Sequence, residues 1–440
     1  MLISPDPRHF ARAATELGES HPVVTHTAIF NAQGIKLVEK GVAVDRSLYE
    51  RLTRHPLRAP LHQCLGSEPA ITGAQVRDAA QQLCAQDPLY GAMLNEPKLR
   101  GALFDELSLI ALPAPISFQL TLMHETQPEH WQHALRSAVT AAWLGARQGA
   151  SRHDMRQLAT AGLLHDLGML HLDPALLQPE VALGPELRRQ LYSHALVTDL
   201  LLEPHLDYPK ALRRAVLEHH EAMDGSGYPR HLSAERISPW GRILGLTELV
   251  TAIGAHGKPA PGLQLSLILR MNGRRYDPLL VREVMQLLNR AGSQPAAVAP
   301  GAPLDVLATV GRLLKRWPSG EQAMQQAGDD ERATLVGLRS AALDRVRGLC
   351  DQIERVLAST GVLDPQLALL AAGADATGQA EAPLADPELA MIAREACWQL
   401  RAASREALNR WQLGPQETVP GWLQTWLDEV DVLCRQELVP

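Results

Sequence analysis

The segment from residue 127 to residue 291 repeats apolar residues at helical spacing, and this pattern limits the possible folds more than any other feature of the chain. It starts with Pro128 and Glu129, residue types that favour the first turn of a helix. Six helices are predicted, and they cover PEHWQHALRSAVTAAWLGARQ, HDMRQLATAGLLHDLG with its end at Gly168, ELRRQLYSHALVTDLLL, YPKALRRAVLEHHEAM, SPWGRILGLTELVTAIGAHG and residues 278–291. A helical region of this length can form a core of its own.

The composition extends this expectation to the whole chain. Apolar residues make up 46% and charged residues 21%, which is typical of globular proteins. Aromatic residues are scarce at 4%, and the abundance of Ala and Leu favours helices. We therefore predict a mostly α fold.

Strand signals occur near the start of the chain. PVVTHTAIF at 22–30 and IKLVEKG after it flank the turn sequence NAQG, so a hairpin is predicted. Helices are predicted over 45–55, where Ser47 and Glu50 have capping-box spacing, and over 73–85, where Thr72 and Gln75 do. The proline-rich LPAPIS at 112–117 is the predicted boundary of a small N-terminal α/β domain, residues 1–115, with a candidate regulatory role.

The end of the chain predicts a further helical domain. AGSQPAAVAPGAP at 291–303 has the composition of a linker, and amphipathic stretches follow at 304–317, 330–359, 388–411 and 421–437. We predict a C-terminal helical domain over residues 296–440. Its apolar faces suit a homodimer or a protein partner, and packing within one chain explains them equally well.

Charge and cysteine usage restrict the partners and the compartment. The net charge of −7 argues against a broad nucleic-acid-binding face, so no DNA partner is expected. Five widely spaced cysteines without a CxxC indicate a reducing compartment. No apolar run approaches 18 residues and no signal peptide is recognisable, which predicts a cytoplasmic protein without a membrane span.

The chemistry is expected before residue 257, because all 17 histidines lie at or before His256. His165 and Asp166 end the apolar run AGLLHDLG, where an ionisable pair is costly unless it is neutralised. The other such pair, His153 and Asp154, stands at a polar helix start, where Asp is either a cap or a partner of the helix dipole. The second setting needs no function, whereas the first indicates either a satisfied buried pair or a site.

Other candidates lie on the neighbouring predicted helices. His219 and His220 end an apolar helix and diverge by about 100°, so they can approach two ions or two sides of one. His194 sits among apolar residues, where a structural role is the alternative. Glu248 either pairs with Arg242 or acts as a ligand.

Glu129 and His133 share a helical face, which is equally consistent with a solvated pair, and His124 and His130 are interpreted as surface residues. Together, five imidazoles and three carboxylates form a candidate set for two or three metal ions, and nitrogen and oxygen ligands of this kind suit Fe or Mn. The set comprises Glu129, His133, His165, Asp166, His194, His219, His220 and Glu248.

LLHDLGMLHLDPALL followed by HHEAMDGSGYP resembles the HD-GYP family, metal-dependent phosphodiesterases that hydrolyse the bacterial second messenger cyclic di-GMP. The resemblance covers about residues 116–295 and implies an HD-type helical bundle core there. It assigns the metal ligands to His133, His165, Asp166, His194, His219, His220 and Glu248, with Glu129 as the extra ligand of trinuclear members. Within that set it implies that Asp166 bridges the metals and that His165 and Asp166 are catalytic.

The same resemblance places a substrate loop directly after the two histidines, and it comprises Asp224, Gly225, Gly227, Tyr228, Pro229 and Arg230. The family lysine after HDxG is Met169 here, which removes a charged hydrogen bond worth roughly 1.5–3 kcal/mol. Tyr228, Arg230 and Lys258 are candidates to replace it. Thr251 stands for a second acid, and His171, Asp173–Pro174 and His231 depart from the family pattern as well.

The family's metal ligands are all present, whereas several substrate-contacting positions differ, and three hypotheses follow. The chain is a phosphodiesterase that opens cyclic di-GMP through a metal-activated water. Alternatively, it is a catalytically weak or inactive signalling module that binds metal and a nucleotide or protein partner. A third hypothesis keeps the enzyme and changes its substrate to another cyclic dinucleotide or a phosphomonoester.

Overall fold

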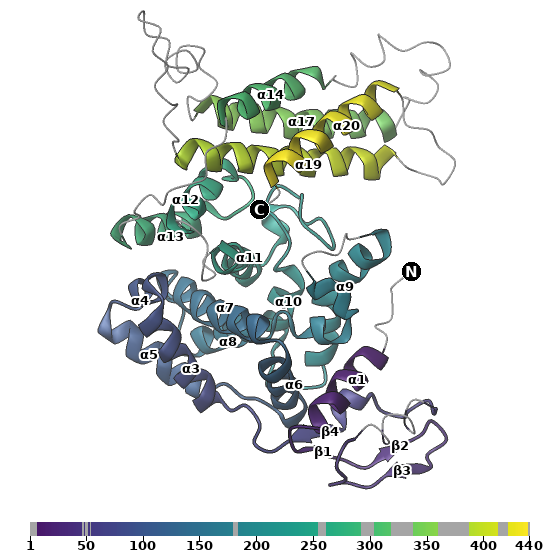
Figure 1. The fold of residues 1–440 in the computed structure, drawn as a ribbon. Helices are drawn as coiled ribbons and strands as arrows, with labels where there is room; N and C mark the ends of the chain where they lie inside the picture. The colour runs from purple at the N-terminus through teal and green to yellow at the C-terminus, as the bar shows by residue number, and fades with distance from the viewer. Residues whose placement is uncertain are drawn as a thin grey trace, which may run out of the picture. The chain divides into compact units, whose positions relative to one another are not determined.

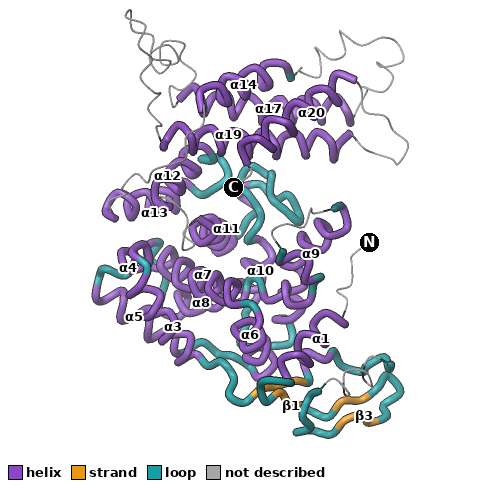
Figure 2. The backbone as a smooth tube through the Cα atoms, in the orientation of Figure 1, coloured by secondary structure: helices purple, strands orange, loops and turns teal. Residues whose placement is uncertain are grey.

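The computed structural model describes residues 7–45, 48, 52, 54–178, 184–253, 261–291, 303–317, 338–359, 387–411 and 421–438. In this part of the chain sixteen α-helices account for most residues, and the four strands are only two or three residues long (Figures 1 and 2). The predicted mostly α fold is confirmed. No described helix is both long enough and apolar enough to cross a membrane.

The backbone contacts divide the chain into two compact units, Met1–Lys258 with Gly273–Gly292, and Pro259–Asn272 with Ser293–Pro440. The first unit holds both the strands and the central helices. A compact unit can contain more than one domain, so the predicted boundaries near residues 115 and 295 stay predictions.

The strands lie in the N-terminal part of the first unit, next to helix α1 (Pro7–Gly18). β2 (Ile29–Phe30) and β3 (Lys36–Val38) pair antiparallel across the predicted turn, which confirms the hairpin. β1 (Val23–Thr25) pairs instead with β4 (Leu65–Ser67), so the prediction of one strand over 22–30 was wrong. The cause is long-range bonding of the backbone at the end of β1, where Thr25 N donates to Val42 O and His26 N to Cys64 O.

The helices of the first unit follow in sequence, and most agree with the expected positions. Thr72 and Gln75 form the predicted capping box at the start of α3. The predicted helix over 45–55 lies mostly outside the described residues. The elements are η1 (Leu61–Gln63), α3 (Gly73–Gln86), α4 (Pro88–Met93), α5 (Pro97–Ser108), α6 (Ala114–Thr126), α7 (Pro128–Arg147), α8 (Arg152–Leu164), η2 (Leu167–His171), η3 (Pro174–Leu177), α9 (Pro185–Leu202), α10 (Lys210–Glu218), η4 (Ala234–Arg236), α11 (Pro239–Ile253) and α13 (Pro278–Ala291).

Two of these helices end earlier than predicted. α8 stops at Leu164 rather than at Gly168, and α10 stops at Glu218 rather than at Met223. Gly168 lies in the short helix η2, where a Cβ atom would come within 2.4 Å of the His194 carbonyl oxygen. Glycine is therefore required here for close packing against α9, and the helix end is set by a tertiary contact rather than by a terminating residue.

The long helices of the first unit pack on one another around the centre. α7 lies along α8, α11 packs on both α7 and α10, and α10 also contacts α8 and α9. Their facing sides are made of small and branched apolar residues, including Ala138, Val139, Leu158 and Leu246, all buried. Burial of such side chains stabilises the bundle by about 0.8 kcal/mol for each methylene removed from water.

His171 connects η2 to the N-terminal elements. Its ring stacks on Phe10 of α1 at 4.6 Å between centroids, and His62 of η1 meets it edge-on at 5.2 Å. Its Nε2 lies 2.8 Å from Oε1 of Gln119 on α6. Burial lowers the pKa of His171 to about 3 and that of His62 to about 4, in both cases with a smaller contribution from a neighbouring histidine.

The second unit is entirely helical in its described part. It comprises α12 (Pro261–Met271), α14 (Pro303–Arg316), α17 (Leu338–Ser359), α19 (Pro387–Trp411) and α20 (Gly421–Leu438). The stretches predicted as amphipathic at 304–317, 388–411 and 421–437 are helices. Trp317 and Trp426 fill their common core, and each indole donates to a backbone carbonyl, Leu343 O and Leu313 O respectively. The predicted linker falls outside the described residues except at its two ends.

Candidate metal centre

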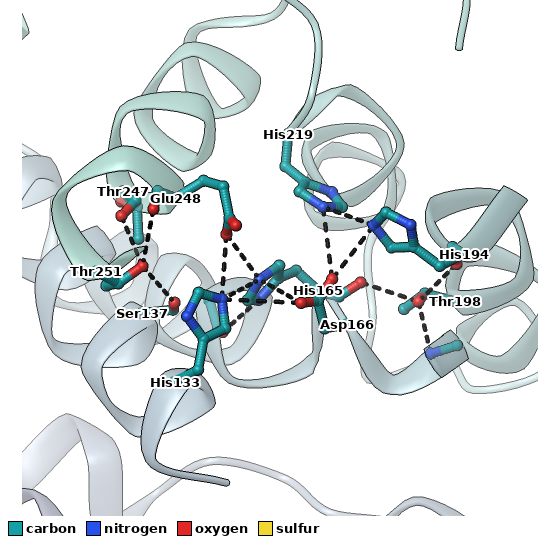
Figure 3. Close-up of polar contacts among 12 residues, drawn as sticks. His133, Ser137, His165, Asp166, His194, Thr198, His219, Thr247, Glu248 and Thr251 are labelled. Atoms are coloured by element: carbon teal, nitrogen blue, oxygen red, sulfur yellow. Dashed lines mark hydrogen bonds and ion pairs between the residues drawn. The ribbon is translucent and has the colours of Figure 1, made fainter. Parts of the chain in front are cut away.

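Seven ionisable side chains from five helices or helix ends converge in the first unit. Figure 3 labels all of them except His220. They form two groups, and within each group one potential ligand atom per residue lies within 4.8 Å of the others. The first group is Asp166, His194, His219 and His220, and the second is His133, His165 and Glu248. The early ends of α8 and α10 matter here, because both His–Asp and His–His sequences follow directly after a last helical residue.

Three of the imidazoles are held by the same local contact. Nδ1 of His165 faces Gly162 O at 2.8 Å, and Nδ1 of His219 faces Val216 O at 2.6 Å. His194 makes the equivalent contact with Leu191 O. A carbonyl oxygen only accepts, so Nδ1 carries the proton and donates in each case, and Nε2 holds the lone pair when the ring is neutral.

These Nε2 atoms point at one another. His194 Nε2 is 3.1 Å from His219 Nε2 and 3.1 Å from His220 Nε2, and His133 Nε2 is 3.1 Å from His165 Nε2. His194 and His219 both donate through Nδ1, so as neutral rings they cannot hydrogen-bond to each other through Nε2. Such an arrangement needs a proton or a metal cation between the lone pairs.

Asp166 lies between the two groups. Its Oδ1 is 3.3 Å from His194 Nε2 and 3.6 Å from His219 Nε2. Its Oδ2 is 3.4 Å from His165 Nε2 and 3.8 Å from His133 Nε2. One carboxylate thus presents one oxygen to each group, which is the geometry of a carboxylate that can bridge two cations.

The donor chemistry fits divalent metal ions. Asp166 Oδ1 is buried and makes no hydrogen bond, although a buried carboxylate oxygen is costly without a partner. Imidazole and carboxylate ligands together suit Fe and Mn. Residues of the first group would hold one ion and those of the second group another, with Asp166 shared between them.

The carboxylates and imidazoles of the two groups shift one another's pKa values against the effect of burial. Burial alone would raise the pKa of Asp166, but His165 and the other imidazoles outweigh it and hold that pKa well below its usual range. Burial would likewise lower the pKa of His165, but Asp166 and Glu248 raise it well above the usual value. Burial lowers the pKa of His219 and His220, which keeps these rings neutral and able to act as ligands.

Glu248 faces the histidines rather than Arg242. Its Oε2 lies 3.1 Å from His133 Nε2 and 3.3 Å from His165 Nε2, whereas Arg242 pairs with Asp277 at 3.2 Å. Burial would raise the pKa of Glu248, but His133 and His165 hold it well below the usual value. Of the two readings that the sequence allowed, the arrangement with Arg242 is therefore wrong.

A buried hydroxyl joins the backbones of two candidate ligands. Thr198 Oγ1 lies 2.9 Å from His165 O and 3.0 Å from His194 O, and it accepts from Gly168 N at 2.9 Å (Figure 3). One hydroxyl proton is shared between the two carbonyls. Thr198 was not singled out from the sequence, since a threonine on an apolar helix face carries no distinctive signal.

The substrate loop predicted from the sequence is tied to the second pair of histidines. Tyr228 N donates to His220 O at 3.1 Å, and the Tyr228 ring stacks on the His220 ring at 4.5 Å. Asp224 Oδ1 accepts from Ser226 N at 2.9 Å, which forms a tight turn before the tyrosine. Gly225 has a positive φ of 76°, and a Cβ on Gly227 would meet Ala222 N at 2.3 Å, so both positions need glycine.

Several predicted residues lie apart from the two groups. Glu129 is exposed and does not belong to either group of described residues. Arg230 contacts Glu218 Oε1 at 3.1 Å, and its backbone N–H donates to Glu221 Oε1. Pro229 is exposed, and Lys258 lies outside the described residues. Their roles stay predictions.

Two of the positions that depart from the family pattern, Met169 and Thr251, carry no charge. Met169 is 8% exposed, and the Thr251 hydroxyl bonds within its own helix to Thr247 O and Glu248 O.

His130 was interpreted as a surface residue, but it is half-buried, and burial lowers its pKa with smaller effects from Asp166, His133 and His165. Its spacing of three residues from His133 was the available signal.

The seven converging residues lie within a segment that matches a known protein family. Residues 117–280 match the family model described as HD domain. The chain is 32% identical over 123 residues to a 3′3′-cGAMP-specific phosphodiesterase 3 of Vibrio cholerae, which covers 28% of this chain and 26% of the relative. It is 30% identical over 194 residues to the cyclic di-GMP phosphodiesterase PA4108 of Pseudomonas aeruginosa. This alignment covers 41% of this chain and 44% of the relative.

Among solved structures, Bd1817, a HDG"Y"P protein from Bdellovibrio bacteriovorus, aligns with a TM-score of 0.34 and 16% identity over 61% of this chain and 94% of that one. The chain spans less than half the length of the two relatives above. The resemblance inferred from the HDLG and HHEAMDGSGYP motifs is confirmed by the family match and by these relatives.

Proposed function

We propose that this chain, with its HD domain at residues 117–280, is a metal-dependent phosphodiesterase that hydrolyses cyclic di-GMP or a related 3′3′-cyclic dinucleotide. The observation that carries the proposal is the position of Asp166, with one carboxylate oxygen toward each of two histidine groups. The names of the relatives support the substrate class, since they act on cyclic di-GMP or 3′3′-cGAMP.

Two or three divalent ions, Fe or Mn by ligand type, would supply a water of lowered pKa and neutralise charge on the phosphoryl oxygens. The chain's own residues hold the geometry. His165, His194 and His219 are fixed in orientation by their Nδ1 bonds, and Glu248 and Asp166 keep their negative charge at neutral pH. In the reaction water adds to phosphorus and one ester P–O bond breaks, which yields a linear dinucleotide.

The first experiment tests turnover. The protein is loaded anaerobically with Fe(II) or Mn(II) and incubated with cyclic di-GMP or 3′3′-cGAMP, and the products are separated by chromatography. Asp166→Ala is the inactive control, and Asp154→Ala is the matched control because it removes the other aspartate that follows a histidine. Linear product from the wild type and Asp154→Ala, but not from Asp166→Ala, supports the proposal. No product from metal-loaded protein contradicts it.

A second function is favoured by one observation, the buried Met169 in place of the family lysine. In this alternative the chain binds metal and a nucleotide or protein partner as a signalling module with little or no turnover. Met169→Lys separates the two functions. An enzyme that lost efficiency gains about tenfold to a hundredfold in kcat/KM when the charged hydrogen bond returns. A binding module with bound metal gains no turnover.

A further inference from the structure

Three aromatic rings form a column that begins at the candidate ligand His220. The Tyr228 ring lies 4.5 Å from the His220 ring at an interplanar angle of 23°, and the Tyr192 ring lies 4.2 Å from the Tyr228 ring at 22°. A single phenol ring cannot accommodate two nearly parallel neighbours on the same face. Tyr228 therefore lies between His220 and Tyr192, and both of its faces are covered.

The column ends at the surface with Tyr192. Tyr228 is half-buried, whereas Tyr192 is 42% exposed. Only one face of the Tyr192 ring is used by Tyr228, so its other face is the open end of the column. A neutral aromatic face beside a charged centre is suited to a planar, polarisable ligand group.

The backbone fixes this open face relative to the candidate metal centre. Tyr192 belongs to α9 and precedes His194 by two residues. Thr198 bonds the same helix to the His165 carbonyl and the Gly168 amide. A shift of α9 would therefore also move the segment 165–168, which carries His165 and Asp166. Tyr228 is held in turn by its backbone bond to His220 O. The platform and the metal-binding side chains are thus parts of one rigid arrangement.

We propose that the exposed face of Tyr192 is the stacking platform for a purine base of the substrate, an inference that rests on the proposed cyclic dinucleotide phosphodiesterase function. A phosphodiester whose phosphate lies at the two histidine groups carries its base within reach of the neighbouring surface. Stacking of a base on an aromatic ring contributes about 1–3 kcal/mol and requires no charge. This contribution offsets part of the binding lost where Met169 replaces the family lysine.

The test compares Tyr192→Ala and Tyr192→Phe with the wild type in the metal-loaded full chain. Leu200→Ala is the matched control, because Leu200 is a 52% exposed apolar side chain on the same helix. The probes are cyclic di-GMP and 3′3′-cyclic di-UMP, which share their phosphodiester ring and differ in their bases. Metal content is measured for every variant, since loss of the platform should leave it unchanged.

For Tyr192→Ala we expect the KM for cyclic di-GMP to rise about fivefold to a hundredfold with kcat changed less than about threefold. Tyr192→Phe and Leu200→Ala should stay within about twofold of the wild type. The preference of the wild type for cyclic di-GMP over cyclic di-UMP should shrink in Tyr192→Ala, because purines stack more strongly. Equilibrium dialysis against cyclic di-GMP repeats the comparison as Kd.

The outcomes separate this inference from the function on which it rests. If the wild type hydrolyses cyclic di-GMP and Tyr192→Ala has the same KM and base preference, the platform is wrong and the phosphodiesterase stands. If the metal-loaded wild type neither binds nor hydrolyses either dinucleotide, the proposed function is wrong and the platform falls with it. If Tyr192→Phe loses as much as Tyr192→Ala, the hydroxyl rather than the ring face is responsible.

Discussion

Helix α8 has a histidine–aspartate pair at each of its ends, and the two pairs are chemically identical but lie in opposite surroundings. At the start, His153 is exposed, and Asp154 is bonded to the capping residue Ser151, whose hydroxyl accepts from Asp154 N at 3.1 Å and donates to Asp154 Oδ2 at 2.8 Å. At the end, His165 is 3% exposed, and Asp166 is surrounded by imidazoles. The same dipeptide is part of the first turn of a helix in one place and the centre of a candidate site in the other.

The comparison shows that the partners, rather than the dipeptide, determine its chemistry. The Ser151 hydroxyl and the positive end of the α8 dipole stabilise Asp154, so no cation is needed there. The charge of Asp166 is stabilised by its neighbour His165 and by imidazoles from α7, from α9 and from the end of α10, which are distant in sequence. A sequence position in an apolar run therefore indicates function only because the surrounding helices also supply ionisable groups.

The largest effect should come from removing each aspartate in turn. Asp166→Ala removes the one carboxylate that faces both histidine groups, so metal affinity should fall by more than about a hundredfold and hydrolysis should be lost. Asp154→Ala should leave the bound metal unchanged and lower stability only by about 1 kcal/mol or less. Metal analysis after dialysis and thermal unfolding measure the two. Equal metal loss in both variants would contradict the comparison.

Lowering the pH should reduce the stability of the fold through the buried His171 in η2, which follows α8, but not through the exposed His153 at the start of α8. The pKa of buried His171 is about 3 and that of His62 about 4, both below the usual 6.5 for histidine, so the unfolded chain binds more protons as the pH falls through this interval. The free energy of unfolding should then fall by up to about 1.4 kcal/mol per pH unit for each histidine between about pH 6 and pH 4, and be fully present above pH 6.5.

His171→Gln keeps an N–H donor near Gln119 and does not titrate, so its unfolding curve should depend less on pH than that of the wild type. His153→Gln is the control at the exposed end of α8 and should follow the wild type. Urea unfolding in a series of buffers gives the slopes. Identical slopes for the wild type and His171→Gln would show that His171 is not the group responsible.

Removal of a single hydroxyl should distinguish contacts between segments from contacts within one helix. Thr198→Val leaves the Gly168 N–H without its acceptor and should cost about 1–3 kcal/mol of stability, together with weaker metal binding. Thr160 is the matched control, because its buried hydroxyl bonds only to Arg156 O within α8, and Thr160→Val should cost about 1 kcal/mol or less. Denaturant unfolding and metal titration measure both. Thr198→Ser should restore most of the loss.

The smallest effect is expected at the exposed end. Ser151→Ala removes the side-chain cap of α8 and should lower the free energy of unfolding by about 1 kcal/mol. Metal content and turnover should stay at the wild-type values, because no residue of either histidine group contacts Ser151 among the described hydrogen bonds. A loss of metal in this variant would mean that the two ends of the helix are coupled.

Local features of this fold follow from the sequence, and long-range ones do not. The capping box at Thr72, the proline start of α7 and the hairpin around NAQG depend on residues close together in the chain. The pairing of β1 with β4 depends on a backbone contact with Cys64, and the end of α8 on the fit of Gly168 against His194. Such contacts form only when distant segments meet, and no local pattern encodes them.

The candidate site divides in the same way. Spacing alone brought attention to His165, Asp166 and the His219–His220 pair, because buried ionisable residues are costly wherever they occur. It could not show that Asp166 faces two groups, that Glu248 turns away from Arg242, or that Glu129 stays exposed. Thr198 and Tyr192 were missed entirely, since a hydroxyl and a phenol become informative only through what they contact.

The stacking of Phe10 on His171 has a consequence for the order of folding. α1 leaves the ribosome long before η2 is made, so the stacking of Phe10 on His171 has to wait for a ring that arrives much later in synthesis. A loop this long also slows the encounter of its ends. Before η2 is made, Phe10 can contact His62 and Phe118, and the His171 ring completes the packing around Phe10 afterwards.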